Sequence, residues 1–282
     1  MIEKRISKQR LIELERCLCD RDKNILTILQ KGRYLTSGQV RRLTFTEHSS
    51  QPAAIRAANR VLLKLQGYGL ISALQRRIGG VRGGSGANVW SLTEAGHRLL
   101  SLNQSKDGIR KRMSEPSVVF LEHTLAIAEA YVQITEICTN YKLELVAADF
   151  EPACWRGYTG ENGKPAALKP DLYAVIASGE YEDCWFIEID LNTEAPCDIL
   201  AKCERYVDYY KSGIEQKQTG VFPQVVWIVP GVPRKESLRR HIAQSWGLRL
   251  KNAFIVITPD ELPRLLVQGP EALTTGKGDI HD

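Results

Sequence analysis

The sequence predicts a mixed α+β protein in two parts, with short helices and a hairpin first and then an α/β sandwich with a mixed sheet. A chain of 282 residues is long enough for about two domains of ordinary size. Charge is divided between the parts: residues 1–115 carry 22 Lys and Arg against 9 Asp and Glu, a net of +13, whereas residues 116–282 carry 16 against 24, a net of −8. The apolar pattern also changes, from short helical periods to strands that alternate with helices.

The expected domain boundaries follow these changes. An N-terminal arm is expected over 1–19, a first domain over 20–102, a polar linker over 103–117, a second domain over 118–268 and a tail over 269–282. The start of the chain is polar and no apolar run is long enough to span a bilayer, so neither a signal peptide nor a membrane partner is expected. Seven scattered cysteines without Cys-x-x-Cys spacing predict reduced thiols and a cytoplasmic protein.

The basic half contains three predicted helices and a hairpin. A helix over 21–30 is followed by a second over 39–43, for which Thr36-Ser37 offers an N-cap, and by a third that starts at Ser50 or Gln51 with Pro52 in its first turn. A glycine-rich stretch at 79–86 then separates two runs that are typical of strands. This order is that of a winged helix-turn-helix domain, and with the net positive charge it predicts double-stranded DNA as the partner.

The third helix has an apolar and a polar face. Its expected core residues are Ile55, Ala58, Leu62 and Leu65. The opposite face supplies four candidates for contact with DNA in the major groove, namely Arg56, Asn59, Arg60 and Lys64. Three arginines of the hairpin are candidates for the minor groove, namely Arg76, Arg77 and Arg82. The alternative is that these cations form only a solvated surface.

The acidic half alternates strands and helices. We expect a helix over 118–139, strands at 143–148, 172–177 and 185–191, a helix from Pro196 to about Gln216, a strand at 224–229, a helix at 234–246, a strand at 253–257 and a final helix after Thr258. The central strands suit an antiparallel hairpin, since turn residues separate them. The order predicts an α/β sandwich with a mixed sheet.

Carboxylates lie at the ends of two of these strands. Asp171 and Glu188 are expected to meet at one end of the hairpin, and Asp190 is expected on the same face as Glu188, because side chains of a strand alternate. Neighbouring acids on a half-buried sheet repel each other unless a cation lies near. Carboxylates of this kind hold Mg²⁺ or Mn²⁺, and a lysine such as Lys202 offsets the charge that develops on a phosphate.

The same residues carry a resemblance to known families. Pro170-Asp171 and Glu188-Ile189 resemble the PD-(D/E)xK motif of the restriction-endonuclease-like superfamily, although Asp190 stands where its lysine belongs. Some members carry that lysine on the next helix, where Lys202 is the candidate. With Lys202, Tyr206 and the run 123–127, the chain further resembles the replication-relaxation family of plasmids and integrative elements.

The resemblance implies roles for individual residues. It implies that Asp171 and Glu188 ligate Mg²⁺ or Mn²⁺ and that Lys202 stabilises the transition state or positions the attacking water. Asp190 is either a further metal ligand or the mark of a site that has lost its chemistry. Three further residues are candidates for supporting this site from outside the ligand set, namely Glu122, His123 and Tyr206, and Glu122 is also a candidate ligand for a second metal ion.

Three functions compete. The first is a metal-dependent endonuclease or nickase that is directed by the winged helix and acts in DNA replication, relaxation or transfer. The second is a non-catalytic initiator, accessory factor or repressor, whose degenerate nuclease domain serves dimerisation and contacts with plasmid replication or transfer proteins. The third is a relaxase with a nucleophilic tyrosine, from Tyr206, Tyr209 or Tyr210. It is disfavoured because the five histidines are not clustered in the sequence as a paired-histidine metal site would need.

Overall fold

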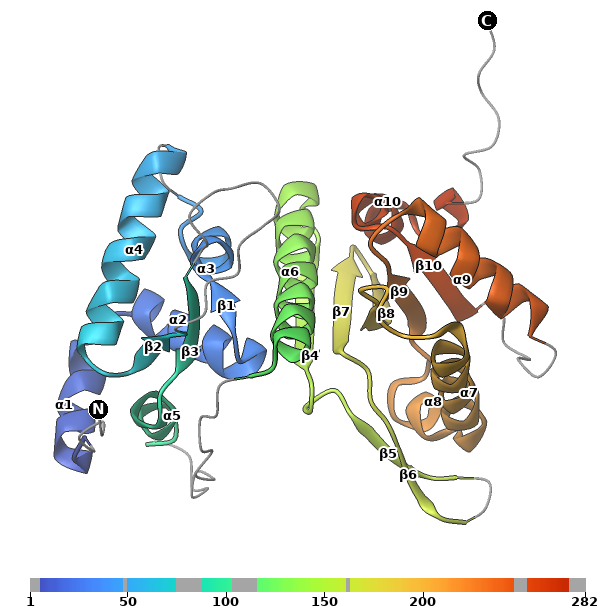
Figure 1. The fold of residues 1–282 in the computed structure, drawn as a ribbon, viewed down its shortest axis with the longest axis horizontal. Helices are drawn as coiled ribbons and strands as arrows, with labels where there is room; N and C mark the ends of the chain where they lie inside the picture. The colour runs from blue at the N-terminus through green and yellow to red at the C-terminus, as the bar shows by residue number, and fades with distance from the viewer. Residues whose placement is uncertain are drawn as a thin grey trace, which may run out of the picture. The chain divides into compact units, whose positions relative to one another are not determined.

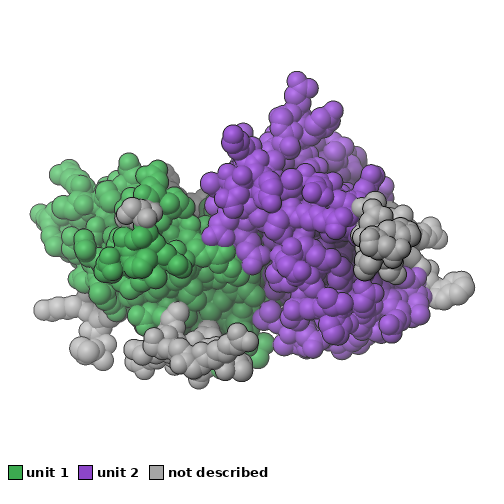
Figure 2. Space-filling view, turned by 90° about the horizontal axis from the view of Figure 1, so that it is seen from above, with its two compact units in different colours: residues 1–132 green, residues 133–282 purple. Residues whose placement is uncertain are grey.

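The structure is a computed structural model and describes residues 6–47, 50–74, 88–102, 116–160, 163–245 and 253–273. It divides into two compact units, residues 1–132 and 133–282 (Figure 2). The division falls within helix α6, Val118–Tyr141. Arg76, Arg77 and Arg82 of the predicted hairpin tip lie outside the described residues.

The first unit combines helices with a small antiparallel sheet. Its elements before α6 are α1 (Lys8–Cys17), α2 (Asp20–Gly32), β1 (Leu35–Thr36), α3 (Ser37–Thr44), α4 (Gln51–Gly67), β2 (Ile71–Ala73), β3 (Val89–Leu92) and α5 (Glu94–Leu100) (Figure 1). The described strands pair in the order β1-β3-β2. The three helices and the hairpin expected from the sequence are therefore present.

Local sequence explains where these helices begin. The Thr36 side chain accepts a hydrogen bond from the backbone of Gln39, whose side chain in turn accepts one from the Thr36 backbone, so that a capping box starts α3. Ser50 caps α4 and Thr93 caps α5 through one hydrogen bond each, which the side-chain hydroxyl oxygen accepts from the backbone of Ala53 and of Gly96. Helix α1 is packed, because Leu11 belongs to the buried core of this unit.

The second unit is built around a mixed sheet. It contains the end of α6, β4 (Glu144–Phe150), β5 (Arg156–Thr159), β6 (Pro165–Leu168), β7 (Leu172–Ser178), β8 (Tyr181–Ile189), α7 (Pro196–Ser212), α8 (Ile214–Thr219), β9 (Gln224–Ile228), α9 (Val232–Gln244), β10 (Phe254–Ile257), α10 (Leu262–Gln268) and the short 3₁₀ turns η2 (Pro259–Glu261) and η3 (Pro270–Leu273). Five described strands are ordered β10-β9-β8-β7-β4. The pairs of β4 with β7 and of β7 with β8 are antiparallel, and those of β8 with β9 and of β9 with β10 are parallel.

This arrangement confirms the expected mixed α and β architecture and its mixed sheet. Helices α7 and α9 share a buried cluster with one face of the sheet, which includes Phe186, Trp227 and Tyr206. Residues that alternate with these, such as Ile187 and Val226, are also buried. Both faces of the central strands are therefore covered, as the near-continuous apolar runs of β8 and β9 require.

The structure also differs from the expectations in detail. Strands β5 and β6 form a two-stranded hairpin that packs against α7, in a stretch expected to be a loop. Helix α7 ends at Gly213, which has φ of +67°, and α8 follows in place of one helix continuing to Gln216. None of the described helices is long and apolar enough to cross a membrane.

Candidate functional site

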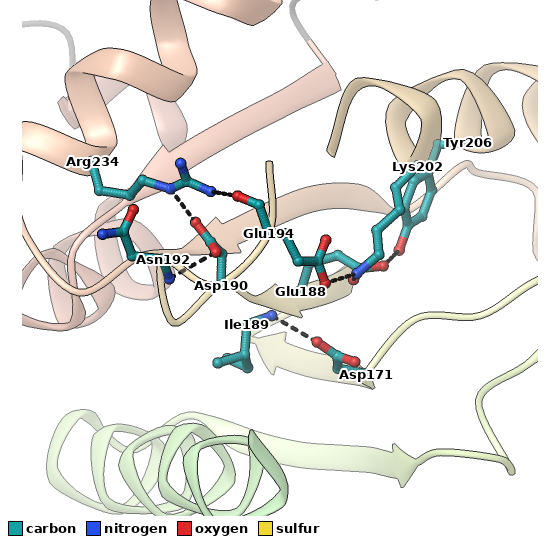
Figure 3. Close-up of polar contacts among 9 residues, drawn as sticks. All are labelled: Asp171, Glu188, Ile189, Asp190, Asn192, Glu194, Lys202, Tyr206 and Arg234. Carbon is teal, nitrogen blue, oxygen red and sulfur yellow. Dashed lines mark hydrogen bonds and ion pairs between the residues drawn. The ribbon is translucent and has the colours of Figure 1, made fainter. Parts of the chain in front are cut away.

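The pairing register of β7 and β8 explains how Asp171 and Glu188 come together. Leu172 pairs with Ile187, so one further step along both strands places Asp171 opposite Glu188. The backbone N–H of Ile189 donates to Asp171 Oδ2 at 2.8 Å (Figure 3). Asp171 is 7% exposed and Glu188 is 2% exposed. The hairpin thus buries two carboxylates at one end of the sheet, as the sequence predicted.

Helix α7 supplies the groups that contact Glu188. Tyr206 donates its hydroxyl to Glu188 Oε1 at 2.6 Å, and the Lys202 ammonium lies 3.6 Å from Glu188 Oε2 (Figure 3). Lys202 and Tyr206 are four residues apart and so lie on the same side of the helix. Glu188 Oε2 is buried and has no hydrogen-bond partner among the described residues. This oxygen is therefore available to a further ligand.

The electrostatics of the pair follow from its burial. Burial, and after it the neighbouring Asp171, raise the pKa of Glu188 to about 8 against the opposing effects of Lys202 and Tyr206. Burial acts to lower the pKa of Lys202, but Glu188 and Glu194 outweigh it and raise that pKa above its ordinary value. Lys202 is therefore charged at neutral pH, whereas the raised pKa of Glu188 favours its protonated form unless another cation is bound.

Asp190 lies apart from this pair. Its Oδ2 accepts a 2.5 Å hydrogen bond from Arg234 Nε, and its Oδ1 accepts one of 2.9 Å from the backbone of Asn192 (Figure 3). Strand β8 ends at Ile189, and α9 brings Arg234 to the residue that follows. Both oxygens are thus engaged, so Asp190 does not join Asp171 and Glu188 in the way that a third metal ligand would.

Sequence reasoning missed two residues of the site, Arg234 and Glu194. Arg234 Nη2 donates to the Glu194 carbonyl at 2.7 Å, and the Glu194 side chain accepts a hydrogen bond of 2.8 Å from Lys202. Arg234 lies 44 residues from Asp190 in the chain, and an arginine after Val232-Pro233 carries no motif. The Asp190–Arg234 pair was not foreseeable without the parallel pairing of β8 with β9.

The carboxylate donors fit a magnesium-type ion in part. Asp171 and Glu188 present hard oxygen ligands, and Glu188 Oε2 is buried without a hydrogen bond. Within the described ranges, no group of three or more His, Cys, Asp and Glu side chains is placed to hold a metal ion. Mg²⁺ is commonly bound by one or two carboxylates, with water and substrate phosphates as its other ligands. The two carboxylates match that mode, whereas Asp190 does not.

The remaining predicted site residues have other surroundings. Glu122 is exposed and His123 half-buried on the part of α6 that belongs to the first unit. Tyr209 is buried and donates to Glu215 at 2.5 Å, which leaves it, like Tyr206, bonded to a carboxylate inside the core. Tyr210 is 40% exposed and packs edge-on against Phe222.

Helix α4 presents most of its predicted DNA-contacting residues to solvent. Arg56, Asn59 and Arg60 are exposed. Lys64 instead makes a 2.6 Å ion pair with Asp22, whose side chain is only 1% exposed, so its charge is used within the unit. Ile55 was expected in the core but is 43% exposed, and Ala54 takes its place on the buried face.

These features define a class of protein. It combines a small helical unit, with cations on one exposed helix face, and a mixed-sheet unit with a buried centre of two carboxylates and a lysine. The model of the replication-relaxation family matches residues 26–225, and the chain belongs to this family. The match includes α4, Asp171, Glu188 and Lys202 and ends before Arg234. Membership suggests a role in the replication or relaxation of a plasmid or other mobile element. No curated protein matches the chain.

Proposed function

We propose that the chain is a DNA-binding protein whose second unit is a metal-dependent endonuclease or nickase. The first part of the proposal is that the first unit is a winged helix-turn-helix domain. The order helix, strand, helix, helix and hairpin, with the described strands arranged β1-β3-β2, supports that assignment. Helix α4 would then be the recognition helix, with Arg56, Asn59 and Arg60 directed to double-stranded DNA.

The observation that carries the nuclease proposal is the environment of Glu188. A carboxylate 2% exposed lies opposite a second carboxylate, with a lysine ammonium at 3.6 Å and one oxygen without a hydrogen bond. Such crowding of acids is costly for the fold alone, and perturbed groups of this kind are enriched at functional sites. The sheet order, with an antiparallel hairpin followed by parallel β9 and β10, supports a restriction-endonuclease-like fold.

Each residue has a defined task in the proposed reaction. Asp171 and Glu188 would hold Mg²⁺ or Mn²⁺, which supplies charge neutralisation and an activated water. The Ile189 N–H fixes the orientation of Asp171. Tyr206 fixes Glu188 in the same way. Lys202, charged and held by Glu194, would stabilise the negative charge that develops on the phosphate.

Plasmid nicking tests this proposal. Supercoiled plasmid carrying its own replication origin is incubated with the protein and Mg²⁺ or Mn²⁺. Nicking is expected from the parent and from Asp183→Ala, an exposed acid at the other end of β8. It is expected to be lost in Asp171→Ala and Glu188→Gln. No nicking of cognate DNA with either metal would refute the nuclease.

A non-catalytic DNA-binding role is the second candidate. The Asp190–Arg234 pair favours it, because an acid stands at the motif's lysine position and is neutralised inside the protein. A domain retained in this form would serve dimerisation or contacts with replication or transfer proteins. Two results would support this role. The protein would bind specific DNA without nicking it, and both the parent and Asp171→Ala would sediment as dimers in analytical ultracentrifugation.

A further inference from the structure

The exposed side chains of Trp155 and Lys169 lie together, and Lys169 is close to Asp171 in the sequence. Trp155 is 38% exposed, and the Lys169 ammonium lies 4.6 Å from the centroid of its ring. Lys169 is exposed and forms no ion pair with any other described residue. Lys169 comes immediately before Pro170-Asp171, so the lysine of the Trp155–Lys169 pair is two residues from a proposed metal ligand.

The backbone around Asp171 fixes the position of the pair. The N–H of Glu151 donates to the Asp171 carbonyl at 3.2 Å, and the buried Cys154 thiol donates to the Pro170 carbonyl at 3.0 Å. These two hydrogen bonds hold the turn that carries Trp155 against the backbone of Pro170 and Asp171. The surroundings of Asp171 thus include an aromatic surface whose place is set by the fold.

Arg156, the residue that follows Trp155, is held by contacts with other parts of the unit. Its guanidinium donates to the Cys154 carbonyl at 2.9 Å, pairs with the buried Glu215 at 3.2 Å and lies 4.8 Å from the ring centroid of Tyr173. These contacts direct the arginine into the core. Trp155 and Lys169 remain at the surface, where both side chains are exposed to solvent.

From this geometry we infer that the Trp155–Lys169 pair binds an unpaired segment of a DNA strand beside the catalytic carboxylates, an inference that rests on the proposed function. Indole stacks on nucleobases of any sequence, and a neighbouring lysine pairs with the adjacent phosphate. Stacking requires a base that is not paired in a duplex, so the ligand is a single strand. The second half of the chain has a net charge of −8, so base stacking gives it an attraction to DNA that does not depend on charge.

Binding of base-bearing and abasic strands tests the inference. A fluorescein-labelled oligothymidine and an abasic strand of the same length carry equal charge, so the first unit's electrostatic contribution cancels in the comparison. The full chain, in EDTA to prevent cleavage, is expected to bind the oligothymidine at least about five-fold more tightly by fluorescence anisotropy. Trp155→Ala is expected to remove this preference, and Trp155→Phe to retain most of it.

The control is another exposed aromatic residue of the same sheet. Tyr181 is 79% exposed at the opposite end of β7 and β8, and Tyr181→Ala is expected to keep the full preference. Lys169→Met is expected to weaken binding of both strands equally. Equal affinity of the parent for the two strands, or equal behaviour of Trp155→Ala and Tyr181→Ala, overturns the inference. Plasmid nicking with Mn²⁺ separates the two proposals: a preference that depends on Trp155 without nicking refutes the nuclease and leaves the binding site.

Discussion

The carboxylate of Glu188 is the most constrained side chain of the candidate site. It is buried beside Asp171, yet only Tyr206 gives it a hydrogen bond among the described contacts, and Lys202 stays at 3.6 Å. Its pKa of about 8 measures how strongly this environment disfavours the charge. A buried carboxylate beside a second carboxylate destabilises the fold, whereas a bound cation would stabilise its charge. This difference is the physical basis for assigning a function to Glu188.

The raised pKa of Glu188 predicts how stability changes with pH. The unfolded chain loses the proton near the ordinary value of 4.5, whereas the folded protein keeps it to about 8. Between these values the unfolded state binds fewer protons, so the free energy of unfolding falls as the pH rises, by at most about 1.4 kcal/mol per unit. Glu188→Gln is therefore expected to lose less stability than the parent from about pH 5 to about pH 8.

Urea denaturation in EDTA measures this difference. Glu182→Gln, at the exposed start of β8, is the matched control and should follow the parent. Identical pH profiles for the parent and Glu188→Gln would show that Glu188 titrates in its ordinary range.

The ion pair of Asp190 and Arg234 predicts a second effect at the residue scale. The Asp190 side chain is fully buried and that of Arg234 is 11% exposed. Removing one partner from a buried pair leaves an uncompensated charge and costs about 3–5 kcal/mol. Arg234→Met is expected to destabilise the protein by this amount, and the double change with Asp190→Asn to recover a large part of it.

Denaturation midpoints of the single and double variants test the coupling. Arg239→Met is the control, because Arg239 lies on the same helix and its side chain is 51% exposed. Additive losses in the double variant would mean that the pair is not coupled.

At the scale of elements, the cationic residues of helix α4 that were expected to contact DNA differ in their surroundings. Arg56 and Arg60 are exposed, whereas Lys64 is paired with buried Asp22. If Arg56 and Arg60 contact phosphates, each alanine variant should reduce the slope of log affinity against log salt by about 0.9. Lys64→Ala should leave that slope unchanged and lower the thermal midpoint instead.

Filter binding across a salt series and thermal melting make the comparison. Gln66→Ala, on an exposed position of α4, serves as the control for both measurements. An undiminished slope in Arg56→Ala and Arg60→Ala would assign the DNA surface to another element.

Elements with strong local signals were predictable from the sequence. The apolar runs of β7, β8 and β9, the Thr36 and Ser50 caps, and the meeting of Asp171 with Glu188 all follow from patterns within a few residues or from one hairpin. The β5–β6 hairpin was not, because its strands are only four residues long and contain glycine and proline, which are typical of loops. Ile55 was misplaced because a helical wheel fixes a face only to within one residue, and the ion pair of Lys64 with Asp22 joins two helices and is not encoded in the pattern of α4.

At the scale of the whole molecule, the limit of sequence reasoning is long-range pairing. Asp190 was expected on the same face as Glu188 because both were placed on one strand, yet β8 ends at Ile189 and Arg234 of α9 pairs with Asp190. Arg234, at the start of α9, also donates a hydrogen bond to the Glu194 carbonyl, and the Glu194 side chain accepts one from Lys202. A network of four charged groups from separate elements depends on topology, which no local pattern encodes.

The division of charge predicts that DNA binding and metal binding are separable in the full chain. With a net of +13 in residues 1–115 and −8 in residues 116–282, duplex affinity should come from the first part and cation affinity from the second. The double variant Arg56→Ala/Arg60→Ala is expected to lose duplex affinity at least about ten-fold. Its Mn²⁺ binding in isothermal titration calorimetry should not change.

Asp171→Ala is expected to show the reverse. It should lose Mn²⁺ binding and, in EDTA, bind duplex DNA at least as tightly as the parent, because the change removes a negative charge close to the proposed DNA path. Loss of duplex affinity in Asp171→Ala without metal, at an unchanged melting temperature, would mean that the carboxylate supports the DNA surface directly. The acidic unit would then be part of the binding surface, and the assignment of the two tasks to separate halves of the chain would be wrong.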